Sequence, residues 1–282
     1  MKAFISIDVE GLPGVSSTTM LNPWNSQYER TVRIITKIVN VLIEQLSRNG
    51  FNDIVVADSH GLMTNIDYLD VHGQAKILQG YPRPYSMVTP LDSTYDASLF
   101  IGYHSAAGTT HGILDHTMSG RTFSEIRING ARASEFLING IYSAENNVPV
   151  ILVAGDEYLK SEVENYSPGT VFIGFKKGVS RYSAIMPTLE VILHDLREKV
   201  NEATNRLKER RVGLIRFEKP YKVEVVFRDS LIADITEQFE KFQRIDAYTI
   251  GFTANSAKEL LGLIELLAII GYGVDSLKSN IK

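Results

Sequence analysis

The stretch that decides the fold is Met1-Lys-Ala-Phe-Ile-Ser-Ile-Asp-Val-Glu-Gly-Leu12, at the start of the chain. Its apolar residues between Phe4 and Ile7 are typical of a buried β-strand, which stops at Asp8 and Glu10. Side chains two positions apart on an extended chain point the same way, so both carboxylates face one spot. A cation between them would remove their repulsion and the cost of desolvating them. The alternative is a strand that ends in solvent with two exposed acids.

The composition limits the class of protein. The chain has 282 residues, of which 44% are hydrophobic and 22% charged, as is normal for a globular protein with a sizeable core. Its net charge of −4 lacks the basic excess of nucleic-acid binders, so no nucleic-acid partner is predicted. There is no cysteine, which excludes disulfides and thiolate chemistry and leaves His, Asp and Glu as ligands for a transition metal.

No segment of the sequence predicts membrane insertion or export. The N-terminus enters a strand directly, without the pattern of a signal peptide. The longest apolar stretch, Leu260 to Val274, is interrupted by Glu265 and by glycines, and is shorter than a bilayer requires. We therefore expect a cytoplasmic protein without a membrane partner.

The first hundred residues predict a parallel sheet. An amphipathic helix over residues 26–48 separates the first strand from a second one at Asp53–Asp58, and a third follows at Ser98–Gly102. This order predicts an α/β fold, with a mostly parallel sheet and flanking helices. Residues 1–182 are predicted to form a metal-binding catalytic α/β domain. Residues 183–282 repeat the strand–helix rhythm, with a final helix predicted over about residues 257–270, and contain no His and acid cluster. They are predicted to form a smaller C-terminal α/β domain or extension.

Acidic residues or histidines follow each of the three predicted strands. Asp8 and Glu10 follow the first strand, His60 the second and His104 the third, while His116 lies on a glycine-rich loop. Glu135 follows shortly after the next turn. Imidazoles and carboxylates are the ligands that a cysteine-free zinc site needs, and two such metals can share a bridging carboxylate. A single His at a strand end is more often a hydrogen-bonded structural residue, so the convergence of several carries the metal hypothesis.

An ordered set of motifs resembles a known family. The set comprises Ser6-Ile-Asp-Val-Glu-Gly11, Asp58-Ser-His60, Gly102-Tyr-His104, Asp115-His-Thr-Met118 and Val153-Ala-Gly-Asp156. It is similar to the motif series of the zinc-dependent D-aminopeptidases of the dipeptide-operon (DppA) type. The resemblance covers about residues 1 to 185, and each motif is short, so their order carries the specificity.

The resemblance implies an amide hydrolase with two zinc ions per chain. It implies that Asp8 bridges the two metals and that Glu10, His60, His104 and Glu135 complete the ligand set, with Glu125 as a nearby alternative to Glu135. His116 matches the family's catalytic histidine. The family is also similar to a self-compartmentalising peptidase built as stacked rings, so a homo-oligomer, with decameric rings, is implied.

The predicted activity is that of a metallo-aminopeptidase. It would hydrolyse short peptides, with a preference for an N-terminal D-amino acid, by means of a metal-activated water. His116 would donate a proton to the leaving amine or stabilise the oxyanion. Asp58 and Asp115 are candidates to orient imidazoles, or are turn-capping residues. Lys176, Lys177 and Arg181 are candidates to meet a substrate carboxylate, or are solvated.

Other functions remain open from the sequence. The same metals would serve an L-aminopeptidase or an amidase acting on other amides, because handedness depends on the pocket walls. A non-catalytic peptide-binding module is an alternative of a different class. Phosphoesterases use similar two-metal sites, but usually with additional basic groups near the metals.

Overall fold

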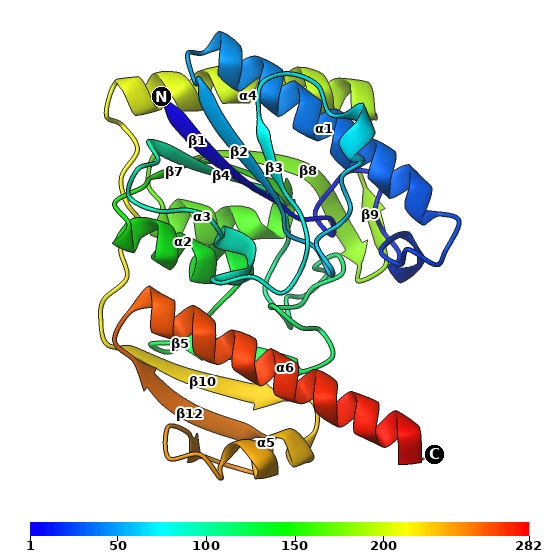
Figure 1. Ribbon diagram of the computed structural model, residues 1–282, viewed down its shortest axis with the longest axis vertical. Coiled ribbons are helices and arrows are strands. Elements are labelled where there is room, and N and C mark those ends of the chain that lie inside the picture. Colours follow the sequence, from blue (N-terminus) through cyan, green and yellow to red (C-terminus); the bar gives the residue numbers. More distant parts are fainter. Residues whose placement is uncertain (282) are drawn as a thin grey trace.

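The computed structural model describes residues 1–281. Its larger layer is a seven-stranded sheet in the order β3-β2-β1-β4-β7-β8-β9 (Figure 1). The strands are β1 (Lys2–Ile7), β2 (Asp53–Asp58), β3 (Lys76–Leu78), β4 (Ala97–Tyr103), β7 (Val150–Asp156), β8 (Val171–Ser180) and β9 (Ser183–Ile185). Neighbouring strands are parallel except β9, which runs antiparallel to β8. The predicted α/β fold with a mostly parallel sheet is confirmed.

Helices cover both faces of this sheet. On one face lie α1 (Tyr28–Arg48) and α4 (Leu189–Lys208), and on the other α2 (Glu135–Glu145) and α3 (Lys160–Tyr166), as Figure 1 shows. Short 3-10 helices, η1 to η4, span Thr18–Met20, Tyr68–Asp70, Ser86–Val88 and Glu157–Leu159. Alternate residues of β1 belong to opposite cores: Ile5 packs with α1 and Phe4 with α2. This double burial explains why β1 is apolar on both faces.

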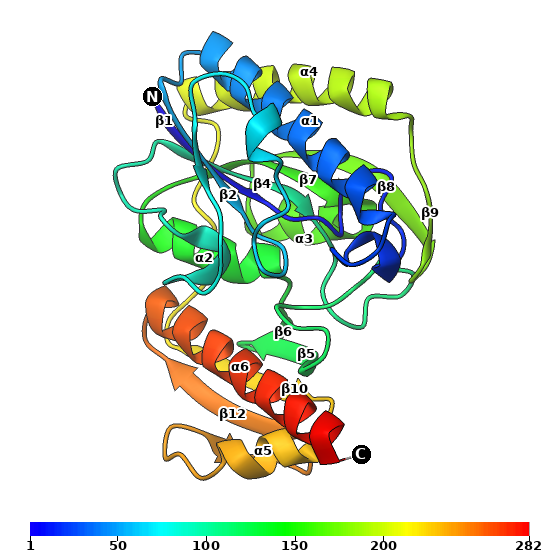
Figure 2. The ribbon, with the colours of Figure 1, turned by 45° about the vertical axis from the view of Figure 1, so that its right-hand side comes forward.

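A second sheet lies below the first in Figure 2, in the order β11-β12-β10-β5-β6. Its strands are β5 (Phe123–Ile128), β6 (Ala131–Arg132), β10 (Tyr221–Phe227), β11 (Gln243–Arg244) and β12 (Thr249–Ala254), all antiparallel. Its helices are α5 (Ser230–Thr236) and α6 (Ala257–Ile281). Because β5 pairs with β10, this sheet combines segments from both sides of residue 182, where the sequence predicts a boundary. That boundary stays a prediction.

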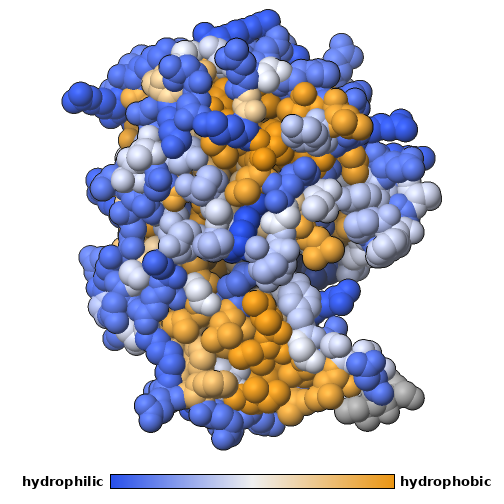
Figure 3. Space-filling model, viewed as in Figure 1, coloured by the Kyte–Doolittle hydropathy of each residue, from blue (hydrophilic) through white to orange (hydrophobic). Residues whose placement is uncertain are grey.

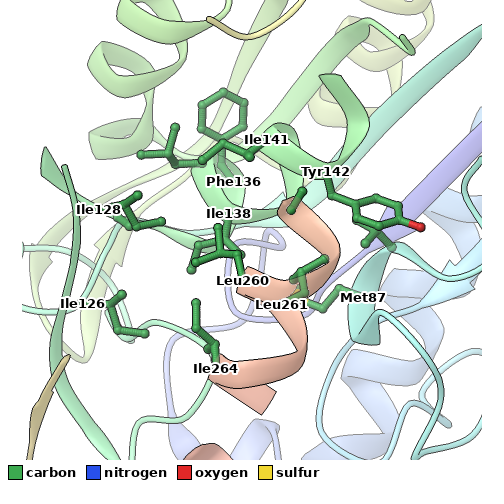
Figure 4. Packing of buried hydrophobic residues seen from close by; sticks show 14 of the residues in the cluster. Met87, Ile126, Ile128, Phe136, Ile138, Ile141, Tyr142, Leu260, Leu261 and Ile264 are labelled. Atoms are coloured by element: carbon green, nitrogen blue, oxygen red, sulfur yellow. The ribbon is translucent and has the colours of Figure 1, made fainter. Parts of the chain in front are cut away.

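The two layers meet along α6. In Figure 4, Leu260, Leu261 and Ile264 of this helix pack against α2 and β5. Gly271 allows a close approach on the same helix, because a Cβ there would lie 2.2 Å from Oγ1 of Thr122. The helix is thereby seated next to the loop that precedes β5.

The opposite side of α6 is exposed and apolar. Leu266, Ile269 and Leu277 are between 44% and 51% exposed, and the lower part of Figure 3 shows a hydrophobic surface. The sequence predicts a final helix ending near residue 270, but α6 continues to Ile281. Over Ala257–Asn280 it is long and apolar enough to cross a bilayer, a criterion of length and composition that core helices also meet. The predicted cytoplasmic location and lack of a membrane partner stay predictions.

Candidate metal centre

The carboxyl ends of β2, β1 and β4 bring the predicted ligands together. These strands are adjacent and parallel, so the residues that follow them share one edge of the sheet. Asp8, Glu10 and His104 are at most 3% exposed, whereas the side chain of His60 is 14% exposed. The charged side chains that follow these buried strands therefore lie in the interior of the protein.

Two glycines bring the ends of β1 and β4 into close contact. The N–H of Gly11 donates to the carbonyl of Gly102 at 2.7 Å. A Cβ on Gly11 would lie 2.1 Å from the carbonyl oxygen of Tyr103, and Gly102 has φ +72°. Only glycine fits both positions, because one lacks space and the other has left-handed backbone. The turn with Asp8 and Glu10 is thus held against the residues before His104.

His104 presents a free ring nitrogen to two carboxylates. Its Nε2 lies 3.6 Å from Oδ2 of Asp8 and 3.6 Å from Oε2 of Glu135. Its Nδ1 lies 3.0 Å from the carbonyl oxygen of Ser105 and so is the donor in the neutral ring. This arrangement leaves the lone pair on Nε2, as a metal ligand requires.

His60 lies on the other side of Asp8. Its Nδ1 is 2.8 Å from Oε2 of Glu10 and 3.6 Å from Oδ1 of Asp8. The two oxygens of Asp8 therefore face different histidines, Oδ1 toward His60 and Oδ2 toward His104.

Glu135 reaches the cluster from the first turn of α2. The sequence predicts this helix from residue 131, but Ala131–Arg132 is strand β6 and the helix begins at Glu135. The hydroxyl of Ser134 caps it by accepting from the N–H of Leu137 at 3.3 Å. The backbone N–H of Met118 donates to Oε1 of Glu135 at 2.7 Å and fixes the carboxylate.

His116 joins the same group from its loop. Its Nε2 lies 3.6 Å from Oε1 of Glu135, and its ring stacks on that of His104 at 4.3 Å. Its Nδ1 lies 3.0 Å from the carbonyl oxygen of Leu114, which orients the ring. The side chain is 18% exposed, so it lies between the cluster and solvent.

The charges in this cluster are not balanced by the protein alone. Burial, and then the charge of Glu10, raise the pKa of Asp8 well above its usual range. Burial also acts on Glu10, but the neighbouring His60 outweighs it and holds the pKa of Glu10 low. Burial, and then the neighbouring His116, lower the pKa of His104. One carboxylate is thus poorly accommodated without a further cation.

Unpaired atoms show where a cation fits. Among the described residues, Oδ2 of Asp8 and Nε2 of His104 are buried without a hydrogen-bond partner, whereas Oε2 of Glu10 has Nδ1 of His60 at 2.8 Å. Such orphaned groups are costly unless something binds them. Two sets have ligand atoms within 4.8 Å of one another: Asp8, Glu10 and His104, and His104, His116 and Glu135. The donor atoms and their spacing fit metal ions of the zinc type.

The two candidates to orient the imidazoles, Asp58 and Asp115, hydrogen-bond to other groups of their loops. Asp58 accepts hydrogen bonds from the side-chain amide of Asn65 at 2.6 Å and from the N–H of Ile66 at 2.9 Å. Asp115 accepts from the N–H of Gly108 and from Arg181, both at 2.6 Å. Both aspartates therefore hold the loops that carry His60 and His116, rather than the imidazoles.

The predicted basic residues occupy different surroundings. Lys176 is 2% exposed and its ammonium donates to the carbonyl of Val15. Burial lowers the pKa of Lys176 to about 7, although Asp156 and the carboxylates of the cluster oppose the shift. Lys177 is exposed and Arg181 is engaged by Asp115.

Two cavities open onto the cluster and share His60 and His116. The first has a volume of about 560 Å³ and also contains Asp8 and Glu135 in its wall. The second, of about 860 Å³, also contains Glu10 and the loop around Trp24. The candidate metal centre therefore lies where the two cavities meet, with space for a ligand on either side.

Several contributors could not be read from the sequence. The carbonyl of Ser105 and the N–H of Met118 are backbone groups, which no residue type signals. Helix α6 contributes Glu265, Ala268 and Tyr272 to the first cavity. The one sequence signal for them is an acid, Glu265, inside an apolar stretch.

Comparisons with known proteins identify the family of this chain. The family described as D-aminopeptidase matches residues 1–266. A curated D-aminopeptidase of Bacillus subtilis strain 168 is 33% identical over 181 residues, which are 64% of this chain and 65% of the relative. The chain thus aligns with slightly under two thirds of that relative's length.

A solved structure extends the likeness to the whole chain. It is described as the zinc-dependent D-aminopeptidase DppA from Bacillus subtilis, a self-compartmentalizing protease. The two structures superpose with a TM-score of 0.91 and 26% identity, over 96% of this chain and 98% of the other. With a family match over most of its length, this chain belongs to the D-aminopeptidase family, as its motifs predict.

Proposed function

We propose that this protein is a metal-dependent aminopeptidase that hydrolyses short peptides with an N-terminal D-amino acid, using two zinc ions. The observation that carries the proposal is the pair of buried, unpaired ligand atoms on Asp8 and His104, beside Glu10 and at the junction of two cavities. Membership of the D-aminopeptidase family and the zinc dependence of the relative from Bacillus subtilis support the choice of reaction and metal.

The arrangement around Asp8 supports two ions rather than one. His60 and Glu10 lie on the side of Oδ1, and His104 and Glu135 on the side of Oδ2. Each ion would take two of these side chains and share Asp8. Three carboxylates against two divalent ions leave a net positive site, which suits a bound hydroxide or a developing oxyanion.

The side chains then have separate tasks. Zinc held by these ligands would lower the pKa of a bound water and polarise the scissile carbonyl. His116 has its Nδ1 directed at Leu114 and its Nε2 directed at the cluster. It would carry a proton to the leaving amine, since it is the partly exposed histidine that stacks on a ligand.

The two cavities suggest how a peptide lies. The side chain of the N-terminal residue would enter the first cavity, whose wall is largely apolar. The rest of the peptide would extend into the second cavity, where Arg121 and Arg181 are the basic residues in the wall. A short peptide ends within reach of these cations, which would favour dipeptides.

We also propose that the chain forms a homo-oligomer, with decameric rings as its expected form. The exposed apolar side of α6 is a surface that a second copy would cover, and the relative is described as self-compartmentalizing. Light scattering tests this, and a monomer at working concentration would contradict it.

The activity is tested with matched D-Ala and L-Ala dipeptides, zinc-loaded protein and a chelated control. Chelator-sensitive cleavage of the D-form alone is the expected result. Cleavage of the L-form would retain the metal chemistry but overturn the handedness. No cleavage of either form by metal-loaded protein would overturn the proposed peptidase activity on these substrates.

A further inference from the structure

The first cavity has one acidic side chain outside the metal centre, Glu265 of α6. Residues 265, 268 and 272 recur at helical spacing and share one face of the helix. That face, with Glu265, Ala268 and Tyr272, forms part of the cavity wall. The acid is therefore directed at the site by the helix register.

The register is fixed by tight packing on both sides of Glu265. Leu261 and Ile264 are buried against α2 and β5 (Figure 4). Gly271 meets Thr122, whose hydroxyl donates to the carbonyl of Ala268 at 3.4 Å. A rotation that moved Glu265 away would break these contacts, so the carboxylate is a built part of the wall.

Apolar side chains line the cavity to which Glu265 belongs. Met63 and Met87 are at most 4% exposed and line the same cavity with Met118. Methionine is flexible and fits unbranched aliphatic chains well. Tyr81 lines the same cavity: burial, and then the nearby carboxylate of Glu265, raise the pKa of the phenol well above its usual range.

The cavity thus combines an aliphatic wall with one carboxylate away from the metal ligands. An apolar stem that ends in a cation would match both parts, since lysine-type side chains bury their methylene groups and pair their charge. Arg121 is the opposing positive group in the same cavity, but it lies where the two cavities join and is 3.7 Å from Asp275. Both members of that pair are largely exposed, so solvent screens them.

We propose that Glu265 makes this enzyme selective for peptides whose N-terminal residue has an unbranched side chain ending in an amine, of the lysine or ornithine type. The inference rests on the proposed aminopeptidase function. With the α-amine and scissile amide held at the metal centre, that side chain enters the first cavity and its ammonium reaches Glu265.

The test compares Lys-Ala with norleucine-Ala dipeptides in both D- and L-series, because norleucine keeps the stem and lacks the charge. For zinc-loaded wild type, kcat/KM is expected to be about 10- to 100-fold higher for the lysine peptide, the range of a charged hydrogen bond. Glu265→Gln should bring this ratio near one and leave norleucine cleavage within about threefold. Glu240→Gln, an exposed acid of the second layer, should keep the ratio.

A binding measurement separates this inference from the activity. Calorimetry of lysinamide and norleucinamide with wild type, Glu265→Gln and a second variant, Glu265→Ala, reads the same preference without turnover. The inference is overturned if wild type cleaves the lysine and norleucine peptides equally well and binds lysinamide and norleucinamide equally tightly. An equal loss on all substrates in Glu265→Gln also overturns it, because the carboxylate would then contact a group that all share. Amide binding with the expected ratio but no cleavage overturns only the proposed function.

Discussion

Oδ2 of Asp8 and Nε2 of His104 lie 3.6 Å apart, buried, and neither has a hydrogen-bond partner. The protein holds these two atoms in place at a cost to its own stability, because desolvated polar groups without partners are unfavourable. Such a relationship is typical of a preorganised ligand set, in which the bound ion repays the cost.

Asp8→Asn should therefore separate stability from metal binding. In chelator, the variant is expected to be more stable than wild type by about 1–3 kcal/mol, since it removes a buried charge whose pKa is raised by burial and by Glu10. Zinc should stabilise wild type and not the variant. Urea unfolding with and without zinc measures both effects.

Asp53→Asn is the matched control, because that acid pairs with Lys76 at the exposed start of β2. The free energy of unfolding of this variant should stay close to that of wild type, with the zinc response intact. A zinc response that survives in Asp8→Asn would contradict the bridging role.

His116→Ala is expected to lower kcat by about 10²- to 10⁴-fold while zinc content stays that of wild type. His111→Ala, an exposed residue of the same loop, should change neither. Metal analysis and steady-state kinetics on the two variants decide the point. A loss of zinc in His116→Ala would make this residue a ligand instead of a proton carrier.

Stability should fall as pH rises through a window set by Glu162. This carboxylate accepts from the N–H of Ser134 at 3.3 Å, and burial raises its pKa from 4.5 to about 7. The folded protein then binds more protons than the unfolded chain between those values, so stability is lost as pH rises. Above pH 7, Glu162→Gln should be more stable than wild type by about 1–3 kcal/mol, and near pH 4 equal to it. Urea titrations of both proteins at pH 4, 6 and 8 test this. A difference in free energy of unfolding that is the same at all three pH values would contradict the role of Glu162.

Two glycines of α6 should respond in opposite ways to alanine. Gly271→Ala places a Cβ 2.2 Å from Thr122 and should destabilise by about 2–4 kcal/mol, because the helix must move. At Gly262 no heavy atom lies within 4 Å of the added Cβ, so Gly262→Ala should stabilise by up to about 1 kcal/mol. Thermal unfolding compares the two variants. Equal changes in stability would contradict the close packing of α6 against Thr122.

The sequence predicts the larger sheet well because its signals are local. Apolar runs such as Asp53–Asp58 predict a buried strand with polar residues at its end. Because three such strands are parallel neighbours, their ends predict that Asp8, His60 and His104 lie close together. The second sheet is harder, because β5 pairs with β10 across almost a hundred positions and no local pattern encodes that pairing. Likewise, periodicity predicts that α6 is a helix, but only its packing determines that Glu265 faces the cavity.

The first cavity is built by two layers: the ends of β1 and β2 and the start of α2 carry the proposed ligands, and α6 of the other layer forms a wall. Chemistry and selectivity are thus encoded in different parts of the gene. A lineage can substitute residues along α6 and acquire new substrates without disturbing the residues that perform hydrolysis. Such a division favours rapid diversification, and it predicts that laboratory evolution toward other peptides would accumulate its changes on this helix.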